Sequence, residues 1–308
     1  MEALCVCSVY MVVGPTLMLV NKDIMSRDGD IVFPYPFLLS SLGLVFTSAL
    51  THGLHAWGKL RLPHAEVVTR RFWVRNLLPV GACHAATLAF GNAQYLYMGV
   101  ALIQFLKAFT PVVVTCFVWL LLGKKASGQV WLALALTCLG TSMTAAGALN
   151  LNLFGLLLAA GSSSTEAVRL VLTQFALQDC NFGLLEGQYF LAPAGALCLL
   201  LLSGLFEFGT IYANGDFYKF HLFPMQFCLA GSLGFGVQML TAGVIKLTSS
   251  ITLKVLSQLR NALVVLSGVL LYGEVVTTLQ LVGYLLAVTG ILRYSLVVAA
   301  EKKKSGGG

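Results

Sequence analysis

The sequence contains very little charge. Only 10% of its 308 residues are Asp, Glu, Lys or Arg, whereas 58% are hydrophobic and the mean hydropathy is +0.86. A water-soluble domain needs more polar residues to cover its surface, whereas a helix in lipid can be apolar on every side. This composition excludes a soluble globular protein and indicates a membrane protein.

Several chemical motifs are also absent. There is no Cys-X-X-Cys pair, and five of the eight cysteines lie inside apolar runs, where they act as small hydrophobic residues. No acidic, histidine or cysteine cluster marks a membrane edge, where a membrane enzyme would hold a metal or a nucleophile. The apolar runs lack the alternating pattern of a porin-like barrel. We therefore expect no enzyme activity, no metal and no cofactor.

Ten apolar runs of helical length follow one another, separated by short polar loops. A bilayer-spanning helix takes about 20 such residues. The predicted fold is therefore an all-α integral membrane protein with ten transmembrane helices. The predicted spans are 2–21, 35–57, 76–97, 99–122, 128–147, 152–177, 185–207, 222–246, 249–273 and 277–299.

The loops on the two sides of the predicted bundle differ in charge. Those on the side of the termini hold ten Lys and Arg residues, and those on the other side hold three. Basic loops stay in the cytosol, so both termini are predicted to be cytosolic. This bias also explains the net charge of +7 without a nucleic-acid partner. The basic loop 59–75 is expected either to contact anionic lipid headgroups or simply to set the orientation.

The sequence also contains an internal repeat. When it is shifted by 150 residues, Gly123 aligns with Gly273 and Gly140 with Gly290. Halves of five helices each have opposite topology, which is the inverted repeat of many secondary carriers, with a site where the halves meet. The predicted domains are an N-terminal repeat over 1–148, a C-terminal repeat over 149–299 and a cytosolic tail over 300–308.

Charged side chains inside the predicted spans point to a binding site, because each costs at least ~2.5–3.5 kcal/mol near the bilayer centre. Lys107 has Gln104 on the same helix face, and the 150-residue shift aligns it with a position one turn from Arg260. Cations without an equal set of buried acids require an external anion, such as phosphate or diphosphate. The predicted substrate-binding residues are Lys107, Arg260, Lys254, Gln104, Gln258, Asn261, Tyr97, Asn92 and Tyr95.

Some of these residues allow a structural alternative. Lys254 lies near a helix end and could extend to the interface instead. Tyr95 and Tyr97 could belong to an interfacial aromatic belt instead of stacking on a sugar or base. Glu166 and Arg169, three residues apart, form either a gating pair or an internal ion pair that fixes helix packing.

Several motifs are together similar to those of one transporter branch. The sequence resembles the triose-phosphate translocator and nucleotide-sugar transporter branch of the drug/metabolite transporter superfamily, in its plant-type subgroup, over nearly the whole chain. The matching positions are Asn21-Lys22 with Phe33-Pro34-Tyr35-Pro36; Asn92, Tyr97, Val100, Gln104 and Lys107; Glu166 to Leu172; Thr252 to Val255 with Arg260-Asn261; and Gly283-Tyr284 with Gly290.

The resemblance implies ten helices, cytosolic termini and strict exchange by alternating access. Family members that exchange phosphorylated sugars for phosphate have two adjacent basic residues where this chain has Arg260-Asn261. No transit peptide precedes the first apolar run, which favours the Golgi or ER membrane over the plastid envelope.

The predicted function is therefore a secondary-active antiporter that exchanges a nucleotide sugar, with a UDP-sugar preferred, for a nucleoside monophosphate. The first alternative is a sugar-phosphate/phosphate antiporter, and alternatives of other classes are a polytopic membrane enzyme or an anion channel. The expected partners are these solutes and membrane lipid, and the sequence leaves open whether the chain is a monomer or a homodimer.

Overall fold

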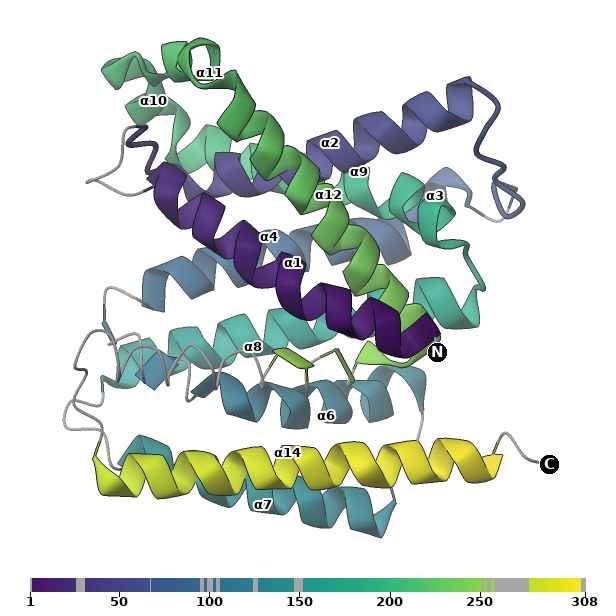
Figure 1. The fold of residues 1–308 in the computed structure, drawn as a ribbon, viewed down its shortest axis with the longest axis vertical. Helices are drawn as coiled ribbons and strands as arrows, with labels where there is room; N and C mark the ends of the chain where they lie inside the picture. The colour runs from purple at the N-terminus through teal and green to yellow at the C-terminus, as the bar shows by residue number, and fades with distance from the viewer. Residues whose placement is uncertain are drawn as a thin grey trace. The chain divides into compact units, whose positions relative to one another are not determined.

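The computed structural model of this chain (Figure 1) describes residues 2–25, 31–66, 68–94, 97–98, 102–103, 106–123, 127–146, 152–250, 252–253, 256–257 and 277–305. All regular secondary structure in these ranges is helical, so the predicted all-α class is confirmed for them. The helices form two compact units, which are described separately below.

Unit 1 comprises residues 1–86 and 172–248. Proline at the first helical position begins two of its long helices, where the missing N–H costs nothing. Its elements are α1 (Glu2–Met25), α2 (Pro36–Ala56), α3 (Arg70–Phe72), η1 (Trp73–Leu77), the part of α4 (Leu78–Gln94) up to Ala86, η3 (Phe175–Asp179), α9 (Leu184–Phe206), α10 (Phe208–Asn214), η4 (Asp216–Tyr218), α11 (Lys219–Leu222) and α12 (Pro224–Leu247).

Unit 2 comprises residues 87–171 and 249–308. Besides the end of α4, its elements are η2 (Lys107–Phe109), α6 (Thr110–Leu122), α7 (Gly128–Ala146), α8 (Leu153–Gln174, of which the last turn belongs to unit 1) and α14 (Thr278–Ser305). Gly123 ends α6 in the left-handed conformation, with φ of 64°, which a residue without Cβ adopts freely.

Three described helices are long and apolar enough to cross a membrane: α2, α9 and α12. Shorter apolar segments lie at 5–14, 110–121, 128–143 and 278–294. Five of these seven segments fall inside one of the predicted spans, and α9 and α12 each extend beyond theirs by a single residue. Most of the predicted span 249–273 lies outside the described residues.

Three segments differ from the prediction. Residues 70–75, expected in a loop, form the first turns of a helix that continues through η1 into α4. Residues 208–221, also expected in a loop, lie in α10, η4 and α11, and α14 continues past the predicted end at 299 to Ser305. Polar helices have no long apolar run to reveal them, so hydropathy alone does not find them.

In unit 1, α2 packs against both α9 and α12, and α12 also packs against α1. The crossing of α2 and α12 is close because Gly43 and Gly234 face one another without side chains. A Cβ added to Gly43 would lie 3.0 Å from the Cα of Gly234, which is too close for ordinary packing. Small residues at such crossings are typical of helix pairs in membranes.

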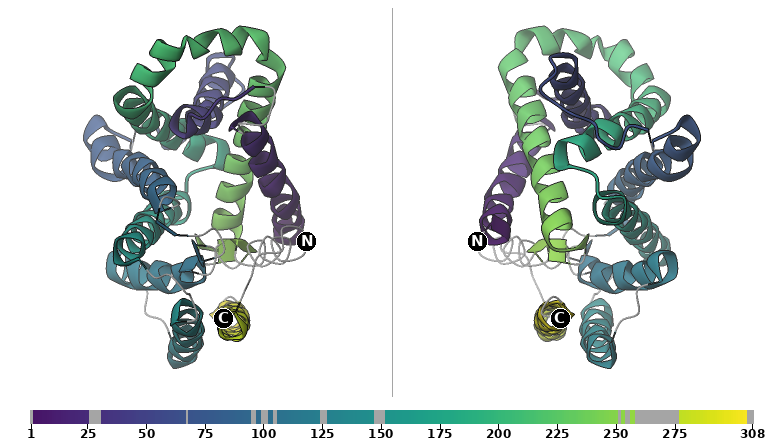
Figure 2. Two further views of the ribbon diagram at one scale, coloured as in Figure 1. Left: turned by 90° about the vertical axis from the view of Figure 1, so that its left-hand side faces the viewer. Right: turned by 90° about the vertical axis from the view of Figure 1, so that its right-hand side faces the viewer.

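In unit 2, α7 and α14 lie side by side in every view (Figures 1 and 2). Gly140 of α7 faces Gly283 and Ala287 of α14, and Gly290 of α14 faces Ala133 and Thr137 of α7. These contacts run in opposite directions along the two helices, so the helices are antiparallel. They are also reciprocal, because Gly283, Ala287 and Gly290 are the 150-residue equivalents of Ala133, Thr137 and Gly140.

This helix pair therefore has the local two-fold geometry that the sequence repeat predicts. The ten-helix inverted repeat stays a prediction for the chain as a whole. The packing units take segments from both halves and so differ from 1–148 and 149–299. The units are defined by contacts between helices, whereas the predicted domains are defined by the sequence repeat. The units therefore do not test the predicted domains, which stay a prediction.

Candidate substrate site

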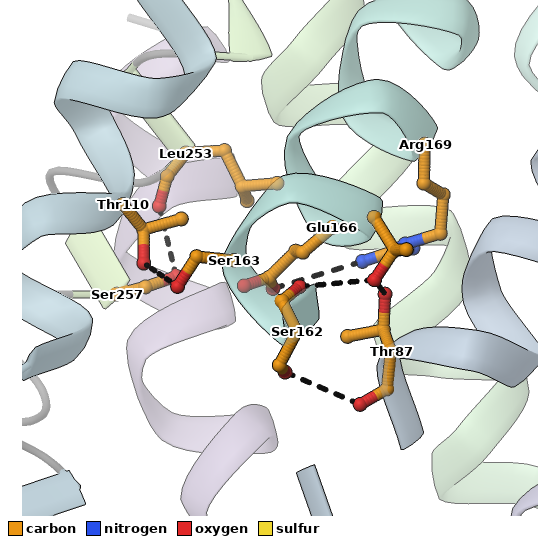
Figure 3. Close-up of polar contacts among 9 residues, drawn as sticks. Thr87, Thr110, Ser162, Ser163, Glu166, Arg169, Leu253 and Ser257 are labelled. Atoms are coloured by element: carbon orange, nitrogen blue, oxygen red, sulfur yellow. Dashed lines mark hydrogen bonds and ion pairs between the residues drawn. The ribbon is translucent and has the colours of Figure 1, made fainter. Parts of the chain in front are cut away.

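A cluster of polar side chains in unit 2 surrounds the middle of α8 (Figure 3). This helix contributes Ser162, Ser163, Thr165, Glu166 and Arg169 within about two turns. The remaining members come from α4, from the start of α6 and from the described residues near 253–257. Polar groups gathered from several apolar helices are the usual composition of a solute site inside a membrane protein.

The contact between α4 and α8 is made by hydroxyl groups. Thr87 and Thr165 share a hydrogen bond of 2.9 Å between their Oγ1 atoms, and Ser162 Oγ donates to the carbonyl of Thr87 at 3.2 Å. Gly91 of α4 also lies at this contact, and a Cβ there would be at an ordinary contact distance of 3.7 Å from Ser162 Oγ. The hydroxyls therefore join the two helices and can exchange these bonds for bonds to a solute.

A break in the helix before α6 positions Lys107. Pro111 has no N–H, and its ring would clash with the carbonyl four residues earlier, which is that of Lys107. Residues 107–109 accordingly form a 3₁₀ turn, in which the Thr110 N–H donates to the Lys107 carbonyl. Thr110 lies one turn from Lys107 and reaches α8, with its Oγ1 3.5 Å from Ser163 Oγ. The half-buried Lys107 thus lies at an irregular backbone segment next to the hydroxyl cluster.

The Glu166–Arg169 pair is loose. Glu166 Oε1 and Arg169 Nη2 are 4.0 Å apart, and the side chains are 23% and 18% exposed respectively. An ion pair at this distance has no direct hydrogen bond. The side chains are nevertheless close enough to neutralise one another, and an anion that approaches Arg169 would compete with Glu166.

Of the remaining predicted substrate-binding residues, the structure describes Asn92 and Tyr97. Asn92 lies on α4, with its Nδ2 atom buried and without a hydrogen-bond partner in the described structure. Tyr97 is 42% exposed and packs edge-to-face on Phe154, with ring centroids 5.0 Å apart. Tyr95, Gln104, Lys254, Gln258, Arg260 and Asn261 lie outside the described residues, so their roles stay predictions.

Thr87, Thr110, Ser163 and Thr165 were not predicted as site residues. Serine and threonine are common in membrane helices, where they bond to backbone carbonyls, and their sequence positions carry no distinctive signal. Thr110 had the best signal, because it lies between Lys107 and the helix-breaking Pro111.

No metal centre was predicted, and the structure offers no evidence for one in the part it describes. No group of three or more His, Cys, Asp or Glu side chains in the described ranges could hold an ion. The chemistry of the α8 cluster is that of hydroxyls, one carboxylate and two cations, which suits an anionic, hydroxyl-rich solute.

Apolar spans, a 3₁₀ turn with a lysine next to an apolar segment, and a polar cluster between helices are together typical of a membrane transporter. The triose-phosphate transporter family model matches residues 1–295, so this chain belongs to that family. The family assignment confirms the resemblance seen in the sequence and agrees with the expectation that the protein is not an enzyme.

Several known proteins and a solved structure are similar to this chain over most of its length. Two probable sugar phosphate/phosphate translocators of Arabidopsis thaliana are each 30% identical to this chain, over 89% of it and 80% and 81% of their own lengths. A third probable sugar phosphate/phosphate translocator of Arabidopsis thaliana is 28% identical over 96% of this chain and 79% of its own length. A solved crystal structure matches 97% of this chain and 98% of its own, with a TM-score of 0.60 and 16% identity, and supports the fold alone.

Proposed function

We propose that this protein exchanges a phosphorylated sugar for inorganic phosphate across a membrane by alternating access. The relatives, which match the chain over at least 89% of its length, carry this proposal, since all three are named as sugar phosphate/phosphate translocators. They favour this alternative over the nucleotide-sugar exchange that the sequence predicted first.

Lys107 is proposed to hold the phosphate group. It lies at the 3₁₀ turn before α6, one turn from Thr110, where a solute oxygen can accept hydrogen bonds from the ammonium and from nearby hydroxyls. Arg260 and Lys254 are proposed as further cations of the same pocket, and Gln104, Gln258 and Asn261 as polar contacts. Asn92, Tyr95 and Tyr97 are proposed to contact the sugar.

Glu166 and Arg169 are proposed to form a gate within unit 2. In the empty carrier, the carboxylate partly neutralises the guanidinium across 4.0 Å. The phosphate of the solute takes over that role when it binds. Because the cations repel one another without an anion, the empty carrier changes conformation slowly, which makes transport an obligatory exchange.

The proposal is tested with purified protein in liposomes loaded with phosphate, with UMP, GMP, CMP or AMP, or with no solute. Labelled glucose 6-phosphate, triose phosphate and UDP-glucose are offered outside. The expected result is sugar-phosphate uptake that requires internal phosphate. Uptake that requires an internal nucleotide would instead establish nucleotide-sugar exchange, and uptake into empty liposomes would indicate a channel.

A substitution connects this activity to the site. Lys107→Gln should lower phosphate exchange about 100-fold, because it removes a charge-assisted hydrogen bond of about 3 kcal/mol to the buried anion. Lys246→Gln is the matched control: Lys246 is also half-buried at a helix end, but its Nζ donates to the Phe182 carbonyl. Exchange that survives in a folded Lys107→Gln protein, or that falls equally in both variants, would contradict this role.

A further inference from the structure

Three arginines at the beginning of the α3–η1–α4 helix line a surface cleft. Arg70, Arg71, Val74 and Arg75 line one side of this shallow, open cleft of about 520 Å³. Positions 70, 71, 74 and 75 are spaced by one helical turn, so they share one face of the helix. All four side chains are exposed. The cleft thus presents three guanidinium groups and one apolar side chain on one side of the helix.

The cleft lies where membrane-spanning helices of unit 1 begin and end. The apolar helix α2 ends at Ala56, and the next residue, Trp57, is 77% exposed, with Lys59 Nζ 5.9 Å from its ring centre. Exposed Trp beside Lys or Arg is typical of the boundary between hydrocarbon and headgroups. The cleft is therefore expected at the level of lipid headgroups.

Two contacts hold the cleft against the start of α9. The Trp73 indole donates to the Phe190 carbonyl at 3.0 Å, which fixes the helix that carries the arginines. The preceding loop is tied down at His64, whose backbone N–H and ring Nδ1 lie 2.8 and 3.1 Å from the Glu186 carboxylate. The cleft is thus built on an anchored segment of the fold.

The positive charge of the cleft is not neutralised by its surroundings. Among the described residues, no ion pair involves Arg70, Arg71 or Arg75. The nearby Glu186 is instead bonded to His64 and to the Gly183 N–H, at 3.0 Å. Residues 57–77 carry five Lys and Arg side chains against a single acid, Glu66. The cleft therefore has positive charge that an anion can neutralise.

We propose that this cleft binds the phosphate group of an anionic phospholipid. Arginine donates paired, planar hydrogen bonds that match phosphate oxygens. Val74, 48% exposed among the arginines, offers contact to the glycerol and acyl region, which a free phosphate ion lacks. The proposal is independent of the transported solute, because the cleft lies in unit 1 and the α8 cluster in unit 2.

The test measures lipid binding to the full-length detergent-purified protein by native mass spectrometry. The probes are dioleoyl phosphatidic acid and dioleoyl phosphatidylcholine, with inorganic phosphate and glucose 6-phosphate as soluble competitors. We expect phosphatidic acid to bind in preference to phosphatidylcholine. Arg71→Gln/Arg75→Gln should weaken phosphatidic acid binding about tenfold or more, since it removes two guanidinium groups that donate paired hydrogen bonds to the phosphate.

The control is Lys59→Gln/Arg61→Gln, which removes the same charge from the same segment without touching the cleft. It should change phosphatidic acid binding by less than about threefold. A third variant, with Arg70, Arg71 and Arg75 all changed to Lys, keeps the charge and should retain weakened binding, and unfolding temperatures of all variants establish that they are folded.

Three outcomes would overturn the proposal. Equal loss in the two double variants would indicate diffuse attraction by the loop. Equal binding of the two lipids would exclude headgroup recognition. Displacement of phosphatidic acid by millimolar phosphate or glucose 6-phosphate would make the cleft a site for a soluble anion.

Discussion

Two acid–base pairs in this protein have the same spacing of three residues but different surroundings. In unit 1, Asp216 and Lys219 approach to 2.8 Å and are 10% and 11% exposed. In unit 2, Glu166 and Arg169 are 4.0 Å apart and 23% and 18% exposed. Sequence spacing alone therefore does not distinguish a tight pair from a loose one.

The difference comes from partners that lie far away in the sequence. Tyr35 Oη donates to Asp216 at 2.6 Å, and Lys219 Nζ donates to the Val32 carbonyl at 2.7 Å. These bonds join the start of α2 to the η4–α11 segment. Near Glu166, the hydroxyls of Ser162 and Thr165 bond mainly to backbone carbonyls of α4 and α8, and one bond joins Thr165 to Thr87. We propose that the first pair stabilises the fold and that the second, with its 4.0 Å separation, rearranges when a solute binds.

The largest expected difference is in stability. Asp216→Asn removes the negative charge that pairs with Lys219 and leaves one accepting oxygen where Lys219 and Tyr35 use two, so it should destabilise the protein by about 2 kcal/mol, as expected for a mostly buried charged hydrogen bond. Unfolding in detergent by heat or denaturant measures this change. The phosphate KM should stay within about twofold of wild type. Unchanged stability, or a large change of KM, would remove the distinction between the two pairs.

A smaller effect is expected at the loose pair. Glu166→Gln should change stability by less than about 1 kcal/mol, as for other partly exposed ion pairs. It should also lower the KM for phosphate about threefold, because the carboxylate no longer competes with the anion for Arg169. Exchange kinetics in liposomes measures the KM.

The matched control for this variant is Glu186→Gln. Glu186 holds the loop at His64, so its loss should lower stability and leave the KM unchanged. If Glu166→Gln were as destabilising as Asp216→Asn, the Glu166–Arg169 pair would be a packing element and not a gate.

The smallest effect concerns pH. Burial alone would raise the pKa of Asp216, but hydrogen bonds from Lys219 and Tyr35 outweigh it and hold this pKa below the ordinary value of 3.8. A lowered pKa in the folded state stabilises the protein above the unfolded pKa, and that contribution is lost as pH falls through the folded value. The stability difference between wild type and Asp216→Asn should therefore be constant from about pH 7 to about pH 5 and shrink only below about pH 4. Its disappearance near about pH 6 would assign the effect to another group.

The sequence predicted much of the helical framework because the relevant signals are local. The apolar runs at 35–57, 185–207 and 222–246 correspond to α2, α9 and α12, since a bilayer requires long apolar segments. Lys107 was also predicted as a site residue from sequence, because a charge within an apolar run is costly wherever it lies, and its role stays a prediction. The assignment of the whole site was less complete, since most of its predicted members lie outside the described residues.

The substrate class was harder to predict from the sequence than the helices were. The pair Arg260-Asn261, with one basic residue in place of two, contributed to the prediction of a nucleotide sugar. The relatives favour a phosphorylated sugar and phosphate instead. Single positions discriminate poorly between solutes that share a phosphate group, because the same cations bind that group in each of them.

The sequence by itself determined that this is a helical membrane transporter with a cation inside an apolar segment, because hydropathy and the cost of buried charge follow from composition and order alone. The tertiary structure decided which groups meet. It brought Thr87 and Thr110 to α8, completed the Asp216–Lys219 pair with Tyr35 from 181 residues away, and joined Trp73, next to the arginines, to the Phe190 carbonyl. Such contacts depend on how helices pack, and packing joins residues whose distance along the chain carries no information about their distance in space.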